Sequence, residues 1–180
     1  MSQDPKAVPV VSIVGTAGSG KTTFLEKLIG ELSKRGVRVA TAKHYLHDYD
    51  TDVPGKDSWR HAQAGSVVAM VSSPDKLSVV QKVAREKSLA ELAAIAFDAQ
   101  ADILLTEGYK RQGVNRVEIF RGERGGELIS AADDLLALVT DVPERAPQGV
   151  PVFGLADASG VADLVQSKFL PANAGATHGE

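Results

Sequence analysis

The chain has 180 residues, of which 43% are hydrophobic, and a formal net charge of −3 at pH 7. This length suits one domain with a sizeable core, and the mildly acidic balance argues against a nucleic-acid-binding surface. The chain has no cysteine, which excludes disulfides and thiolate metal sites, and no apolar run approaches the roughly 20 residues of a membrane span, so we expect a soluble, cytoplasmic protein.

A complete phosphate-binding loop follows the first predicted strand. Residues 10–14 form an apolar run typical of a buried strand, and the helical pattern that starts near residue 22 ends before Gly36. Between them stands the pattern G-x-x-x-x-G-K-T. In that loop, converging backbone N–H groups and the helix N-terminus bind phosphate, Lys21 reaches the β- and γ-phosphates, and the Thr22 hydroxyl can ligate Mg²⁺. The loop consists of Gly15, Thr16, Ala17, Gly18, Ser19, Gly20, Lys21 and Thr22.

Strands and helices alternate along the rest of the chain. We predict strands at residues 37–42, 67–71, 77–80, 102–106, 116–120, 135–139 and 152–155, with 67–71 buried and 116–120 half exposed. Helices are predicted from residue 57 or 58 to 64, from a capping box at residue 88 to residue 97, and over 160–169. The fold class is therefore α/β, of the P-loop NTPase type, with a mostly parallel sheet flanked by helices and a small antiparallel extension. We expect one domain over residues 1–170 and a disordered tail over 171–180.

Ligands of such sheets bind at the carboxyl ends of the strands, so the residues that follow strands are the candidates for function. Glu107 ends the apolar strand 102–106. Its carboxylate can bind Mg²⁺, directly or through water, or orient a water for attack on the γ-phosphate. The alternative is a solvated acid at a strand end.

Asp141 follows the strand predicted at residues 135–139. A carboxylate can accept from both the N1–H and N2–H₂ donors of guanine, a pair that adenine lacks. The alternative is a turn-forming Asp before Pro143.

The polar segment from Lys43 to Asp52 contains His44, His47 and Asp48, and it is followed by a Pro-Gly turn and by Lys56 and Asp57. These side chains can contact the phosphates, Mg²⁺ or a second substrate, or form a transition-metal site, or serve only as a solvated loop. For Asp57, capping a helix is the simpler interpretation. Five cations follow Glu107, and one or two of them can meet an anionic ligand: Lys110, Arg111, Arg116, Arg121 and Arg124.

In this order, the motifs resemble the MobB family of molybdopterin-guanine dinucleotide biosynthesis proteins. The resemblance spans about residues 9–169 and is most specific at Pro-Gly-Lys-Asp-Ser (54–58) and Glu-Gly-Tyr-Lys (107–110). It implies a homodimeric GTP-binding adaptor with weak GTPase activity. It also implies a partner nucleotidyltransferase of the MobA type, which joins GMP to molybdopterin; molybdopterin and molybdoenzyme chaperones are further candidate partners.

Carried over residue by residue, the resemblance implies that Gly15 to Thr23 bind GTP and Mg²⁺, that Glu107 is the Walker-B-like acid and that Asp141 contacts guanine. His44, Asp48, Lys56 and Asp57 fall on family motif positions. Two other classes remain as alternatives: a small-molecule P-loop kinase, and a metallochaperone GTPase that uses His44 and His47, which the lack of cysteine weakens.

Overall fold

The computed structural model describes residues 7–45 and 53–170. Among these, residues 7–44 and 89–170 form one compact unit, and residues 45 and 53–88 form a second. The first unit contains the P-loop, Glu107 and Asp141, and is called the core unit below. Within the described ranges, no helix is long and apolar enough to cross a membrane.

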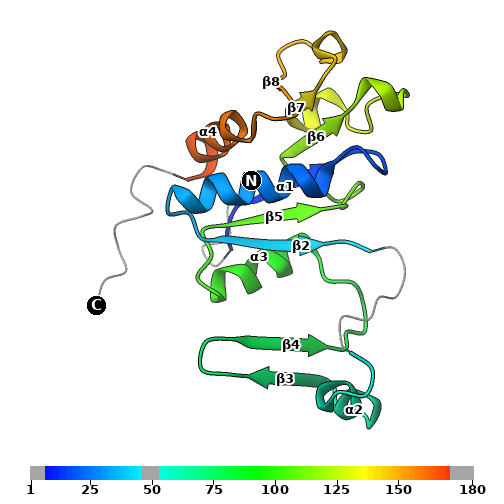
Figure 1. Ribbon diagram of the computed structural model, residues 1–180, viewed down its shortest axis with the longest axis vertical. Helices are drawn as coiled ribbons and strands as arrows, with labels where there is room; N and C mark the ends of the chain where they lie inside the picture. Colours follow the sequence, from blue (N-terminus) through cyan, green and yellow to red (C-terminus); the bar gives the residue numbers. More distant parts are fainter. Residues whose placement is uncertain (1–6, 46–52, 171–180) are drawn as a thin grey trace. The chain divides into compact units, whose positions relative to one another are not determined.

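A six-stranded sheet forms the centre of the core unit, in the order β2-β5-β1-β6-β7-β8 (Figure 1). All neighbouring strands in it are parallel. The carboxyl ends of the strands therefore share one edge, as the predicted α/β fold requires. The strands are β1 (Val10–Val14), β2 (Val39–Lys43), β5 (Ile103–Glu107), β6 (Arg116–Phe120), β7 (Leu135–Thr140) and β8 (Val152–Phe153).

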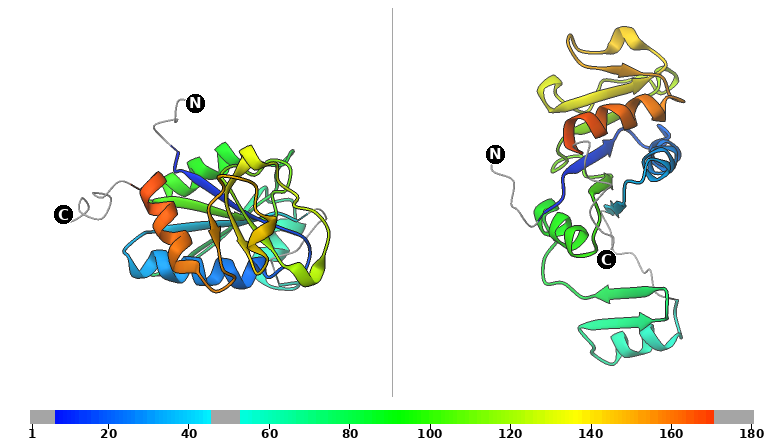
Figure 2. Two further views of the ribbon diagram at one scale, coloured as in Figure 1. Left: turned by 90° about the horizontal axis from the view of Figure 1, so that it is seen from above. Right: turned by 90° about the vertical axis from the view of Figure 1, so that its left-hand side faces the viewer.

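Helices cover both faces of this sheet (Figure 2). On one face, α1 (Lys21–Lys34) and α4 (Ala158–Phe169) bury side chains such as Leu28 and Val161 against alternate strand residues such as Ile13. On the other face, α3 (Leu89–Asp98) packs Ala93 and Ala96 on Leu104. The larger core thus lies under α1, the helix that begins directly after the P-loop.

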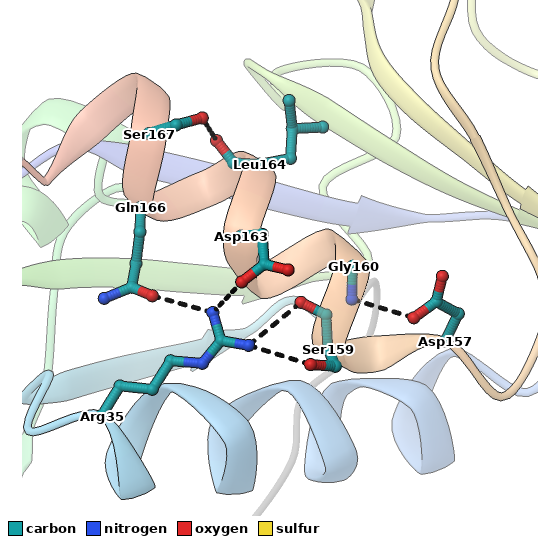
Figure 3. A network of polar contacts seen from close by, with 8 residues as sticks. All are labelled: Arg35, Asp157, Ser159, Gly160, Asp163, Leu164, Gln166 and Ser167. Atoms are coloured by element: carbon teal, nitrogen blue, oxygen red, sulfur yellow. Dashed lines mark hydrogen bonds and ion pairs between the residues drawn. The ribbon is translucent and has the colours of Figure 1, made fainter.

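A polar network fixes the end of α1 against α4 (Figure 3). The Arg35 guanidinium donates to Asp163 Oδ1 at 2.6 Å, to Gln166 Oε1 at 2.8 Å, and to the carbonyl and hydroxyl oxygens of Ser159 at 3.2 and 3.0 Å. Asp157 caps α4 by accepting from the Gly160 N–H at 2.9 Å, so the helix begins at Ala158, two residues before the predicted start.

The prediction that residues 116–120 are half exposed is wrong, because all five residues of β6 are buried. The two charged residues of β6, Arg116 and Glu118, are buried and have polar partners. Glu118, 1% exposed, accepts from the N–H groups of Ile129 and Ser130 at 2.8 and 3.0 Å. Arg116 pairs with Asp134 at 3.1 Å. A buried charge is tolerated when it is hydrogen-bonded, so alternation does not require solvent on one face.

The second unit contains α2 (Asp57–Gln63) and the antiparallel pair of β3 (Val68–Ser72) and β4 (Leu77–Gln81). This pair is the predicted antiparallel extension. The prediction that residues 67–71 form a buried strand is wrong, since three of the five β3 residues and all of β4 are exposed. An apolar run typical of a buried strand here lies on a two-stranded ribbon, which is too small to form a core of its own. Residues 171–180, predicted to be disordered, lie outside the described residues, and the single-domain prediction stays a prediction.

Candidate functional site

The P-loop connects β1 to α1 at the carboxyl edge of the sheet, and its first glycine cannot be replaced without strain. Gly15 has a φ of +145°, and a Cβ on it would lie 2.5 Å from the carbonyl oxygen of Ile119 on β6 and 2.8 Å from Ser19 Oγ. The loop therefore passes directly against the neighbouring strand. Ser19 is fully buried, and its hydroxyl has no hydrogen-bond partner among the described residues.

Lys21, the first residue of α1, directs its ammonium back across the loop and donates to the carbonyl oxygen of Thr16 at 2.6 Å. An ammonium has three N–H donors, so this bond holds the head group in place and leaves donors for a further acceptor. The P-loop thus has a cation fixed inside it, as phosphate binding requires.

The next residue joins the loop to the second predicted site residue. Thr22 Oγ1 donates to the Glu107 carboxylate, at 2.9 Å from one oxygen and 3.0 Å from the other. Lys43 Nζ lies 3.5 Å from Glu107 Oε1, since β2 and β5 pair in a register that sets these two residues side by side. The Glu107 side chain is only 10% exposed, so the carboxylate is held with little freedom.

Burial, two further lysines and one acid among the described residues act on the pKa of Lys21. Burial lowers the pKa of the Lys21 ammonium, the nearby Lys110 lowers it further, Glu107 opposes the shift, and Lys43 adds to it. The charged form of Lys21 is therefore disfavoured here when no anion is bound. A bound phosphate would offset that effect, because an opposite charge at close range favours the charged form.

His44 contacts the same edge through both its backbone and its ring. Its N–H donates to the Glu107 carbonyl oxygen at 2.9 Å. Its ring lies 4.8 Å from that of the buried Tyr109, measured between ring centres. A Cβ on Gly108, whose φ is +96°, would lie 3.1 Å from the His44 carbonyl oxygen. The chain can turn this closely after Glu107 because a glycine follows.

Asp141 lies at the end of β7 with its side chain on the chain segment that follows β6. Its Oδ1 accepts from the Gly122 N–H at 2.8 Å. Asp141 is exposed, and Gly122 begins the 3-10 turn η1 (Gly122–Arg124). The carboxylate thus holds this turn while its second oxygen makes no hydrogen bond within the described part of the chain.

The other predicted contacts lie in the second unit or outside the described residues. Lys56 and Asp57 belong to the second unit, where Lys56 precedes α2 and Asp57 begins it and lies 3.9 Å from Arg60. An acid in the first helical turn is favourable without any ligand. Asp48 and His47 lie outside the described residues. Among residues 7–45 and 53–170, no group of three or more histidine, aspartate and glutamate side chains is arranged to hold a metal ion.

Two arginines that the sequence placed only in a general cationic group lie directly over the P-loop. Arg121 Nε donates to the Ser19 carbonyl oxygen at 3.0 Å. The Arg124 guanidinium is so close to Gly18 that a Cβ there would lie 3.0 Å from Nη2. Arg121 directly follows β6, so the strand-end rule that selected Glu107 would have selected it as well, had β6 been predicted to be a central strand.

The cluster fits a magnesium nucleotide in its choice of atoms. The glycine loop, the Lys21 ammonium and the two guanidinium groups are donors for phosphate oxygens. The Thr22 hydroxyl and the Glu107 carboxylate are hard oxygen ligands of the kind that Mg²⁺ takes. This arrangement can bind a polyphosphate and hold a divalent cation beside it.

A family model described as molybdopterin guanine dinucleotide synthesis protein B (MobB) matches residues 10–141. The chain is 35% identical over 136 residues to a molybdopterin-guanine dinucleotide biosynthesis adapter protein of Haemophilus influenzae, covering 76% of each chain. It is 33% identical to the adapter protein of Escherichia coli, over 88% of this chain and 91% of that one. The crystal structure of Bacillus subtilis MobB superimposes with a TM-score of 0.69 at 30% identity, covering 89% of this chain and 98% of that one.

Proposed function

Since this chain belongs to the MobB family of molybdopterin guanine dinucleotide synthesis proteins, we propose that it is an adapter in that synthesis which binds GTP and Mg²⁺. The family match and the adapter relatives support the biosynthetic role. The nucleotide and the cation are inferred from the residues at the carboxyl edge of the core sheet.

One observation carries the nucleotide proposal: the hydrogen bond from Thr22 to Glu107. It joins the last residue of the P-loop motif to the acid of the adjacent strand, so that a hydroxyl and a carboxylate stand together next to Lys21. When bound there, Mg²⁺ would neutralise charge on the phosphate oxygens. Thr22 and Glu107 would hold the cation, Lys21 would contact the β- and γ-phosphates, and Asp141 would accept from guanine.

The proposed GTPase activity is weak. The charge of Glu107 acts on Lys21, and its carboxylate is already engaged by Thr22 and Lys43. A carboxylate committed to positioning is a poor general base, so we assign Glu107 to the cation and expect slow turnover of GTP.

The proposed partner is a nucleotidyltransferase of the MobA type, which would join GMP to molybdopterin while this chain acts as its adapter. The relatives are named adapter proteins, and an adapter acts through a second protein. Molybdopterin and molybdoenzyme chaperones remain proposed partners of the same assembly, and the proposed location is the cytoplasm.

A homodimer is proposed from the second unit considered by itself. The β3–β4 pair exposes large apolar side chains, with Met70 at 65% and Leu77 at 61% exposure, followed by Val71 and Val79. Exposed apolar side chains gathered on a short ribbon mark an interaction surface. We propose that a second copy of this chain covers them.

Calorimetric titration of GTP in the presence of Mg²⁺ tests the nucleotide proposal. Lys21→Ala should abolish measurable binding while the far-ultraviolet circular dichroism is unchanged. It removes the charge inside the loop and one bond to the Thr16 carbonyl oxygen, and it leaves the helix and the strands intact. Lys34→Ala is the matched control: Lys34 lies at the other end of α1, where it pairs with Glu31 at 2.8 Å, and its loss should leave the affinity intact. Equal GTP affinity in the wild type and in a folded Lys21→Ala variant would contradict the proposal.

A further inference from the structure

We propose that Arg124 binds the phosphate chain of the nucleotide in cis, carried by an arginine arm that consists of Arg121 and the turn η1 (Gly122–Arg124). This inference rests on the proposed nucleotide binding. It adds Arg124 as a phosphate contact that approaches the P-loop from the segment after β6, and Arg121 and Asp141 as the residues that position that segment.

The arm is attached to the P-loop at one end. Arg121 Nε donates to the Ser19 carbonyl oxygen at 3.0 Å. The same guanidinium lies above the end of the loop, since a Cβ on Gly20 would be 3.4 Å from its Nη2. Arg121 therefore acts as a positioning residue that anchors the arm on the loop.

The arm is attached to β7 on its other side. Asp141 Oδ1 accepts from the Gly122 N–H at 2.8 Å, and the Arg124 N–H donates to the Arg121 carbonyl oxygen at 3.1 Å, which closes the turn. Two fixed points and one closed turn define where the side chain of Arg124 begins. The arm thus connects Asp141, which is predicted to contact guanine, with the P-loop, which is predicted to bind phosphate.

Arg124 is the member of the arm that remains available to a ligand. Its side chain makes no hydrogen bond or ion pair with any residue in ranges 7–45 and 53–170, although Glu123 is its neighbour in sequence. Its guanidinium nevertheless lies over the middle of the P-loop, 3.0 to 3.5 Å from the position of a Cβ on Gly18. The guanidinium and the backbone N–H groups of the loop are all donors, so an anion bound between them would supply an acceptor to both.

The surrounding charges favour an anion at this point. The Lys21 ammonium lies within the same loop and is near Lys110 and Lys43. Glu107, the acid of the cluster, is engaged by Thr22 and Lys43. A guanidinium can donate two parallel hydrogen bonds to a phosphate, so Arg124 adds both charge and geometry to what Lys21 supplies.

The test compares the affinities of GTP, GDP and GMP for the wild type, Arg124→Gln and Arg124→Lys, all with Mg²⁺. A charged hydrogen bond is worth about 1.5–3 kcal/mol, and exposure places Arg124 at the lower end, so we expect Arg124→Gln to weaken GTP binding about tenfold. GMP should change by less than about twofold, because it lacks the phosphates over the loop centre. Arg124→Lys should recover part of the loss, and the loss should shrink as salt is raised.

Arg38→Gln is the matched control. It removes the same charge at the opposite edge of the sheet, where Arg38 pairs with Asp102 at 2.7 Å, and should leave the affinity of all three nucleotides unchanged. If the wild type binds GTP and Arg124→Gln binds it equally well, the arm proposal is wrong while the nucleotide proposal stands. An equal loss for GTP and GMP also overturns the arm proposal. If the wild type binds no nucleotide, the proposed function itself fails.

Discussion

Replacing Asp141 separates the two tasks that its carboxylate would perform. Oδ1 accepts from the Gly122 N–H at 2.8 Å, and the second oxygen is available for a base. In Asp141→Asn, the amide oxygen should keep the bond to Gly122, because the opposite orientation would set an NH₂ group against an N–H donor. The NH₂ group then replaces the oxygen that would accept from guanine.

The expected loss of GTP affinity follows from replacing that one carboxylate oxygen by an NH₂ group. One hydrogen bond to a charged group contributes about 1.5–3 kcal/mol, and since Asp141 is exposed we expect the lower value, so GTP affinity should fall by about tenfold. ATP offers no matching pair of donors and should change by less than about twofold. Asp141→Ala should also remove the acceptor of Gly122, which is worth about 0.5–1.5 kcal/mol, and should therefore weaken ATP as well, by about two- to tenfold.

Competition of GTP and ATP against a fluorescent guanine nucleotide measures these affinities. Asp133→Asn is the control, because it makes the same exchange in the turn η2 (Ala132–Asp134), which immediately precedes β7. It should alter neither affinity. If Asp141→Asn weakens GTP and ATP to the same extent, Asp141 serves only the arginine arm and the assignment to guanine is refuted.

Three further predictions concern the cation, the loop and the fold. Glu107→Gln should retain GTP binding, because Thr22 keeps an acceptor. It should lower Mg²⁺-dependent hydrolysis about tenfold or more in a phosphate-release assay, because the anionic ligand of the cation is lost. Unchanged hydrolysis at saturating Mg²⁺ would contradict this. Gly15→Ala should destabilise the protein by about 1–3 kcal/mol in denaturant unfolding, since its Cβ would meet the Ile119 carbonyl oxygen at 2.5 Å; wild-type stability would show that the loop can move away. Arg35→Met should lower the free energy of unfolding by only about 1–2 kcal/mol, because the ion pair to Asp163 is largely exposed and each of the other contacts adds little. It should leave the GTP affinity intact. An altered affinity would mean that α4 is coupled to the site.

The sequence by itself was enough to predict the order of the elements and the position of the P-loop between its strand and its helix. Gly15 to Thr22 lie between an apolar strand and an amphipathic helix, and both the loop pattern and its context are local in sequence. The parallel sheet followed from the alternation of strands and helices, because parallel neighbours need crossovers. The placement of Glu107 next to Thr22 followed in outline from the strand-end rule, and the contact between them agrees with it.

Only the tertiary structure decided which polar residues are buried, and which side chain meets which across the sheet. The pattern of residues 116–120 gave no sign that Glu118 accepts from two backbone N–H groups of a later segment, because that pairing depends on strands and turns that are distant in sequence. The same holds for the bond from the Gly122 N–H to Asp141 and for the position of Arg124 over Gly18. Strand order and register place these groups together, and neither is encoded in the periodicity of a single segment, since each strand pairs according to packing against elements elsewhere in the chain.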